Sequence, residues 1–184
     1  MTVVLLIVLA VVVLVVGGVI FVYNRLVALR NKIEGAWAQI DVQLRRRYDL
    51  IPNLVETVKG YAAHEQETLD AVTTARSAGM HAEGPADQAE AENMLTGALK
   101  SLFAVSEAYP DLKANENFLQ LQEELTGTEG RIAYARQYYN DAVQSYNTRI
   151  QTFPTVLVAN AANFSAREYF EADGESRGPV SVSF

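Results

Sequence analysis

The segment from Val3 to Val22 limits the possible folds of this chain more than any other feature. Its sequence, VVLLIVLAVVVLVVGGVIFV, consists only of apolar residues and glycine. A helix of this length spans about 30 Å, which is the thickness of the hydrocarbon core of a bilayer. A cleaved secretory signal would need a basic start, a shorter apolar core and a small-residue cleavage site, and the sequence has none of these. Residues 1–22 are therefore predicted to form an uncleaved transmembrane anchor.

The charges around this segment predict which way it crosses the membrane. Arg25, Arg30 and Lys32 follow it, whereas only the α-amino group precedes it. Basic residues accumulate on the cytoplasmic side of membrane spans. We therefore expect a single-pass protein whose N-terminus lies outside and whose C-terminal domain is cytoplasmic.

Helical spacing of apolar residues continues beyond the anchor without a break. Apolar side chains recur at steps of three and four residues, with Trp37 beside them, at Leu26, Leu29, Ile33, Ala36, Ile40 and Leu44. We expect the transmembrane helix to continue directly into the first helix of the domain. Asp49 and Pro52 form the first helix-breaking signal, and they predict that a second helix begins near Pro52. A continuous helix with a kink at Pro52 is the alternative.

Two more helices are predicted downstream. The second helix should end near Gly79, and a loop over residues 81–87 (HAEGPAD) should lead to a third helix over 88–109. The third helix is expected to turn inward its residues Ala91, Met94, Leu95, Ala98, Leu102 and Val105. The fourth helix has the strongest pattern in the chain. Its large side chains recur every seven residues, at Phe118, Leu125, Ile132, Tyr139, Tyr146 and Phe153.

The partner positions of this seven-residue repeat hold Leu121, Thr128, Ala135 and Ala142. This is the seam of a helical bundle, in which the tyrosines should fill the core while their hydroxyls reach the surface. Four amphipathic helices with mostly short connections favour an antiparallel, up-down four-helix bundle over residues 23–170. The predicted fold class is all-α, and the polar residues 171–184 are predicted to be a flexible tail.

The composition argues against most enzyme and nucleic-acid functions. The chain has a net charge of −7, whereas nucleic-acid-binding domains usually carry a basic surface. It has no cysteine, which excludes disulfides, thiolate catalysis and cysteine-bound zinc. The segment from His64 to Thr68 begins like HExxH but has Thr68 where the second histidine should be. Since no nucleophile elbow or phosphate-binding loop occurs either, we expect no enzyme activity, cofactor, metal, nucleic acid or small-molecule substrate.

Two features remain as candidate sites. Arg45, Arg46, Arg47, Tyr48 and Asp49 form the densest group of charges and are a candidate surface for a protein partner. Successive helical side chains point about 100° apart, so at least one arginine should meet the bundle edge and pair with a carboxylate such as Asp41 or Asp49. A solvated helix end is the alternative interpretation of this cluster. Glu65 lies within an apolar stripe and is a candidate for a buried ion pair with an arginine.

Three segments closely resemble the LemA family of bacterial membrane proteins. They are YNRLVALRNKIEGAWAQIDVQLRRRYDLIPNLVETVKGYAAHEQETL, YPDLKANENFLQLQEELTGTEGRIAYARQYYNDAVQSYNTRIQTFP and, more weakly, NFSAREYFE. The resemblance implies an antiparallel four-helix bundle on an N-terminal membrane helix, with the N-terminus outside a bacterial cell membrane. It implies no reaction. Family members are sometimes encoded beside a membrane metalloprotease, and magnetosome relatives are linked to membrane vesicle formation.

The leading hypothesis is a membrane-anchored helical scaffold that self-associates as a homo-oligomer. The alternative is an adaptor that binds another membrane protein, such as a membrane metalloprotease, through the arginine cluster or through residues 171–184. A channel is disfavoured because the single span has no ionisable side chain.

Overall fold

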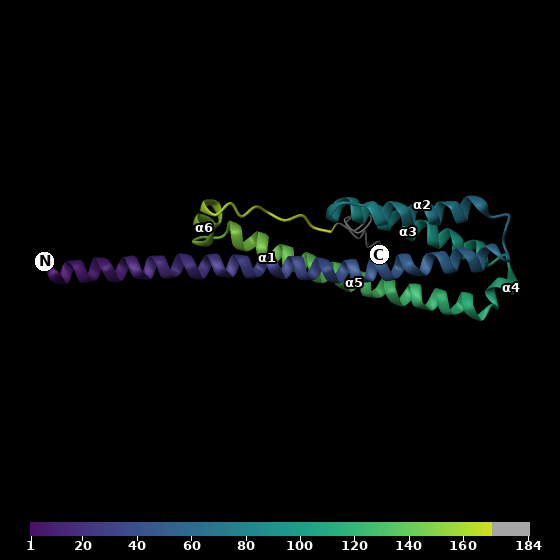
Figure 1. Cartoon of the computed structure of the whole chain (residues 1–184), viewed down its shortest axis with the longest axis horizontal. Coiled ribbons are helices and arrows are strands. Elements are labelled where there is room, and N and C mark those ends of the chain that lie inside the picture. Colours follow the sequence, from purple (N-terminus) through teal and green to yellow (C-terminus); the bar gives the residue numbers. More distant parts are fainter. Residues whose placement is uncertain (171–184) are drawn as a thin grey trace, which may run out of the picture. The chain divides into compact units, whose positions relative to one another are not determined.

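A computed structural model describes residues 1–170; the predicted flexible tail, residues 171–184, lies outside the described residues. The described part is helical and contains no strand (Figure 1). In chain order its helices are α1 (Thr2–Lys59), α2 (Gln66–His81), α3 (Gly84–Ser106), α4 (Pro110–Lys113), α5 (Glu116–Gln151) and α6 (Thr155–Ala161). The prediction of an all-helical fold with one long apolar N-terminal helix is confirmed.

The first helix is longer than the preferred prediction. α1 runs without interruption from Thr2 to Lys59 and includes Pro52, so the expected start of a second helix at Pro52 is wrong. A proline has no N–H, which deprives the carbonyl of Tyr48, four residues earlier, of its helical partner. Arg76 of α2 replaces that partner, because its Nε donates to the Tyr48 carbonyl oxygen at 2.8 Å. The helix therefore continues for two more turns past Pro52.

Two further boundaries differ from the prediction. Gly79 does not follow the second helix but lies buried inside α2, which ends at His81. The loop predicted over 81–87 shortens to Ala82 and Glu83, because α3 already begins at Gly84. Gly84 has a φ of 86°, a backbone conformation that suits glycine, and Pro85 follows in the first turn of α3.

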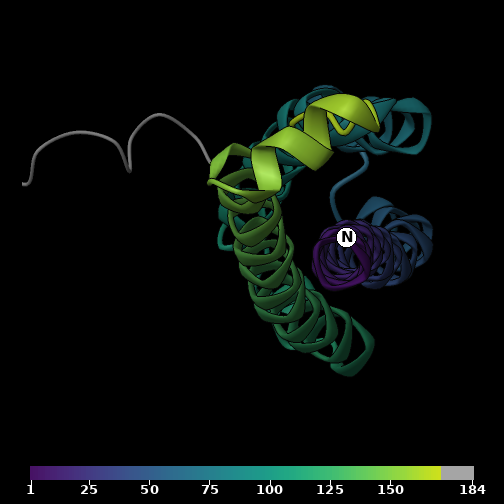
Figure 2. The ribbon, with the colours of Figure 1, turned by 90° about the vertical axis from the view of Figure 1, so that its left-hand side faces the viewer.

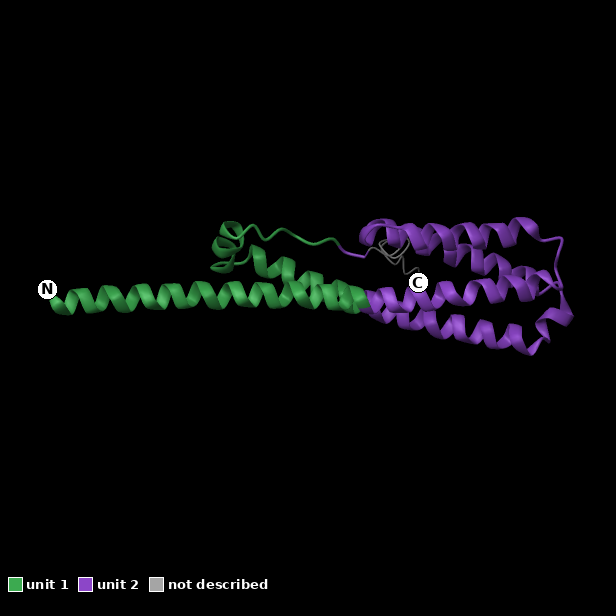
Figure 3. Ribbon diagram, viewed as in Figure 1, with its two compact units in different colours: residues 1–38, 137–168 green, residues 39–136, 169–184 purple. Residues whose placement is uncertain are grey.

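The chain divides into two compact units, and α1 and α5 contribute residues to both (Figure 3). Unit 1 comprises residues 1–38 and 137–168, and unit 2 comprises residues 39–136 with the segment from residue 169 onward. The predicted apolar stripe of α1 is buried in both units, at Leu26, Ile33, Ala36, Ile40 and Leu44. The seven-residue repeat of α5 is likewise buried from Phe118 to Tyr146, and among its partner positions Leu121 is half-buried.

The seam of α5 ends before its last predicted member. Phe153 is 80% exposed, so its expected place in the core is wrong. α5 stops at Gln151, and residues beyond a helix end no longer follow the helical period. Ile150 is the last buried apolar residue of this helix.

A non-helical segment, residues 163–168, lies along α5 within unit 1, and we call it the C-terminal strap. Tyr139 and Tyr146 donate their hydroxyl protons to the carbonyl oxygens of Glu168 (2.9 Å) and Ser165 (3.0 Å). Asn147 bonds the main chain of Arg167 twice, accepting from its N–H at 2.9 Å and donating to its carbonyl at 2.8 Å. The tyrosine hydroxyls therefore hold the strap, and the expectation that they reach the surface is wrong.

Candidate functional site

The apolar segment of α1 has the properties of a membrane span. Residues 1–21 are all exposed, and the most apolar window of this helix buries no residue against the rest of the described chain. Figure 2 looks onto the N-terminal end of this helix. Each backbone N–H and C=O of a helix is bonded within the helix, which is the condition for crossing hydrocarbon. By length and composition, α1 is the one helix among residues 1–170 that fits a membrane span.

The arginine cluster, residues 45–49, is divided between surface and core of unit 2. Arg45 is exposed and pairs with Asp41 at 2.9 Å, one helical turn earlier. Arg46 is half-exposed and lies 3.7 Å from Glu124 of α5. Arg47 is buried, with 3% of its side chain exposed, and its Nη1 donates to Glu92 Oε2 of α3 at 2.8 Å. An arginine does pair with Asp41, but it is the exposed Arg45, whereas the arginine that meets the core, Arg47, pairs with Glu92 and not with Asp41 or Asp49.

Glu92 is the centre of a buried polar cluster formed by Arg47, Tyr48, Gln88 and Glu92. The Glu92 side chain is 2% exposed, and its Oε1 accepts from the Tyr48 hydroxyl and from Gln88 Nε2. Arg47 also donates through Nη2 to the Thr96 hydroxyl at 2.8 Å. A buried charge is tolerated only when it is paired and hydrogen-bonded, and both members of this pair meet that condition.

Tyr48 joins this buried polar cluster to α2. Its hydroxyl accepts from Gln88 Nε2 at 2.8 Å, and the same nitrogen also donates to the carbonyl of Gly79 at 3.2 Å. Burial raises the pKa of Tyr48 well above its ordinary value, and the hydrogen bond to the Glu92 carboxylate raises it further. The phenol therefore stays neutral at physiological pH and can donate to Glu92.

Gly79 is needed where α2 approaches Tyr48. A Cβ added at Gly79 would lie 2.9 Å from Tyr48 Cζ, a distance that real side chains avoid. Only a residue without a side chain lets the Tyr48 ring reach Glu92 past α2. This packing role explains why a glycine lies inside the last turn of α2, although glycine is otherwise unfavourable within a helix.

Glu65 does not form the buried ion pair predicted for it. It is half-buried in the link before α2 and accepts a hydrogen bond from the Tyr109 hydroxyl at 3.1 Å. That hydrogen bond raises the pKa of Tyr109. Within residues 1–170, the charges that pair in the core are those of Arg47 and Glu92.

The sequence interpretation missed Gln88 and Glu92. A signal was present, because the buried positions of α3 recur at steps of three and four, at Gln88, Glu92, Leu95, Leu99, Leu102 and Ser106. Two polar residues open this stripe, which marks them as core residues that require partners. Of the residues predicted to face inward, Ala91, Leu95 and Leu102 are buried, whereas Met94 is 50% exposed.

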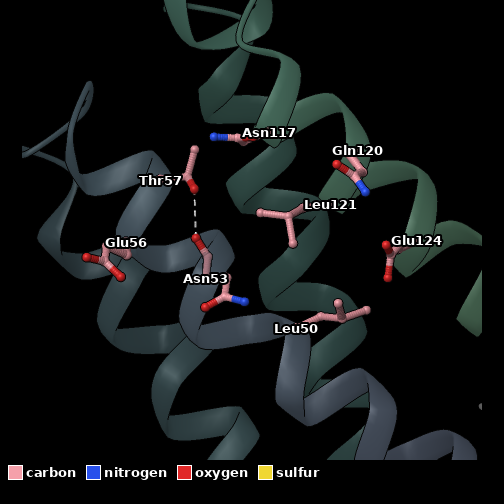
Figure 4. A pocket seen from close by; sticks show the side chains of 8 residues that line it. All are labelled: Leu50, Asn53, Glu56, Thr57, Asn117, Gln120, Leu121 and Glu124. Atoms are coloured by element: carbon pink, nitrogen blue, oxygen red, sulfur yellow. Dashed lines mark hydrogen bonds between the residues drawn. The ribbon is translucent and has the colours of Figure 1, made fainter.

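A second candidate surface is a polar pocket between α1 and α5 in unit 2 (Figure 4). The pocket has a volume of about 470 Å³. Its lining residues are Leu50, Asn53, Glu56, Thr57, Asn117, Gln120, Leu121 and Glu124. Three of these carry side-chain amides, and Glu124 also faces Arg46, so this pocket adjoins the exposed part of the arginine cluster. Among residues 1–170, no group of three or more histidine, aspartate or glutamate side chains is arranged to hold a metal ion.

The exposed apolar segment of α1 and the helices that follow it in the chain define a membrane-associated helical protein. The match to known proteins agrees with this class, because the model of the LemA family matches residues 36–184. The chain belongs to the LemA family.

Relatives named LemA and relatives named MamQ both match most of the chain. Protein LemA of Metamycoplasma hominis is 31% identical over 93% of this chain and 80% of its own length. Magnetosome protein MamQ 2 of Paramagnetospirillum magneticum is 26% identical over 86% of this chain and 68% of its own length. Magnetosome protein MamQ of Magnetospirillum gryphiswaldense is 24% identical over the same shares, 86% and 68%.

Proposed function

We propose that this protein is a membrane-anchored helical scaffold that self-associates at a bacterial cell membrane and carries out no reaction of its own. The observation behind this proposal is the continuity of α1. One helix begins in a fully exposed apolar segment and then supplies buried core residues to both units. The apolar segment holds no ionisable side chain that transport would use, so anchoring is the role that its chemistry supports.

The proposal includes an antiparallel four-helix bundle in which α1, α2, α3 and α5 take part. Hydrogen bonds and ion pairs within unit 2 support it. Arg47 links α1 to α3, Arg46 links α1 to α5, and Arg76 links α2 to α1. Thr96 of α3 donates to Glu129 of α5 at 3.3 Å, and Gln88 of α3 donates to the Gly79 carbonyl of α2 at 3.2 Å.

The proposed orientation places the N-terminus outside and the part of the chain after the apolar segment in the cytoplasm. Arg25 and Lys32 are exposed just beyond the apolar segment. Basic residues at this position favour the cytoplasmic side. Labelling of an introduced N-terminal cysteine with an impermeant thiol reagent tests this orientation, and we expect labelling on intact cells. If the cysteine is labelled only after lysis, the N-terminus lies inside and the proposed orientation is wrong.

Self-association is tested by cross-linking in native membranes. The chain has no cysteine, so Leu14→Cys places a single thiol in the apolar segment. Oxidation should yield disulfide-linked dimers at native expression level. The control is an unrelated monomeric single-span protein with a cysteine at equal depth. A yield no greater than that of the control would exclude a self-associating span.

An adaptor is the second candidate, and the exposed Arg45 and Arg46 beside the polar pocket favour it. The partner would be another membrane protein, such as a membrane metalloprotease, with an acidic surface. The test is an affinity purification with Arg45→Glu and Arg46→Glu together. Arg47 stays unchanged because it belongs to the core. Lys100→Glu with Arg131→Glu is the matched control at exposed helical positions of unit 2. If the protein is an adaptor, a specific partner should be lost from the Arg45→Glu, Arg46→Glu variant and kept by the control variant.

A further inference from the structure

The turn between α5 and α6 exposes one large apolar side chain, and α6 itself exposes another. Phe153 is 80% exposed and Leu157 is 62% exposed. They are four residues apart, and Ala161, four residues further, is also exposed. A spacing of four places Leu157 and Ala161 on one face of α6, and Phe153 lies in the turn that leads into this helix. We call Phe153, Leu157 and Ala161 the α6 face.

The α6 face lies in the longest region of the described chain, after the apolar segment, that holds no charge. Residues 150–166 contain no lysine, arginine, histidine, aspartate or glutamate. Arg149 and Arg167 flank this region on either side. A soluble surface would normally interrupt an exposed apolar stretch with charges, whereas an interfacial segment places its cations at the edges.

α6 packs beside the end of the apolar segment of α1 within unit 1 (Figure 1). The two helices line an open pocket of about 430 Å³ with an almost wholly apolar lining. The residues that line it include Val19, Ile20 and Tyr23 of α1 and Leu157, Val158 and Ala161 of α6. α6 is therefore level with the last turn of the segment predicted to lie in hydrocarbon.

We propose that the α6 face is a second membrane contact, which enters the boundary between lipid headgroups and acyl chains beside the span. Phe153 and Leu157 insert into this boundary, and an acyl chain fills the pocket between α6 and Ile20. Lipid is the expected occupant of this pocket, because the pocket is continuous with the surface of the span that would face lipid. Arg149 and Arg25 are exposed nearby and suit anionic headgroups.

Burial in lipid would remove two exposed apolar side chains from water without any partner protein. An interfacial segment of this kind gains free energy in proportion to the apolar area it buries. The contact would also restrict rotation of α1 about its own axis, because α6 touches the membrane on one side of that helix. The inference depends only on the anchoring part of the proposed function and not on self-association.

The absence of cysteine allows a direct depth measurement. Full-length protein with a single cysteine at 153 or 157 is labelled with an environment-sensitive fluorophore and reconstituted into phospholipid vesicles. The vesicles carry a nitroxide quencher on the lipid, either near the headgroup or deep in the acyl chain. Leu119→Cys is the matched control, since Leu119 is an apolar side chain of unit 2 with 48% exposure. Val12→Cys reports the middle of the apolar segment.

We expect the shallow quencher to remove about half or more of the emission at 153 and 157, and to leave position 119 unchanged. The deep quencher should act on position 12. If 157 is quenched no more than 119 while 12 is quenched, the α6 contact is wrong and the anchor stands. If 157 is shielded from lipid and instead cross-links between copies, a second copy covers this face and the lipid proposal fails. Absence of quenching at 12 would overturn the anchor and the α6 contact together.

Discussion

Replacing Glu92 by glutamine removes the negative charge of the buried ion pair while keeping the shape of the side chain. Arg47 then remains 3% exposed with a full positive charge. Its other partners are the Thr96 hydroxyl at 2.8 Å and Glu129 at 3.7 Å, and the Glu129 side chain is 51% exposed. Removing one member of a buried pair usually destabilises a protein by about 3–5 kcal/mol. Because Glu129 compensates in part, we expect Glu92→Gln to lower the free energy of unfolding by about 3 kcal/mol.

The assay is thermal unfolding of the full-length protein in detergent micelles, followed by far-ultraviolet circular dichroism. For a domain of this size, a loss of 3 kcal/mol corresponds to a fall in Tm of about 6–12 °C. The matched control is Glu124→Gln, which removes the half-exposed ion pair of Arg46. Partly exposed pairs of this kind contribute about 0–1 kcal/mol, so the control should change Tm by no more than about 4 °C.

A double substitution separates the charge effect from the packing effect. Arg47→Met with Glu92→Leu replaces the ion pair by apolar side chains, an exchange that is often neutral or stabilising. The double variant should therefore unfold at a higher temperature than Glu92→Gln. If Glu92→Gln alone lowers the free energy of unfolding by less than about 1 kcal/mol, the pair is hydrated or dispensable and the reasoning is refuted.

Three further predictions concern the surroundings of Tyr48. Gly79→Ala should destabilise unit 2 by about 1–3 kcal/mol in denaturant titrations despite the higher helix propensity of alanine, and a neutral or stabilising effect would contradict the close contact. Arg76→Met should cost about 1–3 kcal/mol by leaving the Tyr48 carbonyl unbonded, whereas adding Pro52→Ala should restore that loss by returning the helical N–H. The third concerns alkaline pH. Since the pKa of Tyr48 is raised above its ordinary value of 10.0, its unfolded form loses its proton first and stability falls as pH rises above 10.0. Tyr48→Phe should remove this part of the pH dependence, and an unchanged slope would show that Tyr48 is not the group responsible.

The helices of this chain were predictable because their periodicity records which side chains are buried. The stripe of Leu26, Ile33 and Ile40 and the seam of α5 both follow from spacing alone. Pro52 misled the prediction because a proline removes a local hydrogen bond, and the group that replaces it, Arg76, lies 28 residues away from the Tyr48 carbonyl. No local pattern contains that information.

The polar core of unit 2 was predictable only in part. Three consecutive arginines must point in different directions, which correctly indicated that they would not share one environment. Which of them is buried depends on the carboxylate that meets it, and Glu92 is separated from Arg47 by 45 residues. Gly79 looked like a helix end because its requirement comes from the Tyr48 ring and not from its own backbone.

The C-terminal strap is held in an unusual way for its length. Four hydrogen bonds from Tyr139, Tyr146 and Asn147 all end on main-chain atoms of the strap. Asn147 offers one donor and one acceptor to Arg167, as the backbone of a neighbouring β-strand would. These four hydrogen bonds from α5 therefore depend on the main chain of the strap and not on its side chains. They require only that residue 167 has an N–H. A proline is the one natural residue that fails this requirement. The side chains of Phe164 and Arg167 instead contact Tyr23 and Glu34 of α1, so α5 holds the main chain of the strap and α1 contacts its side chains.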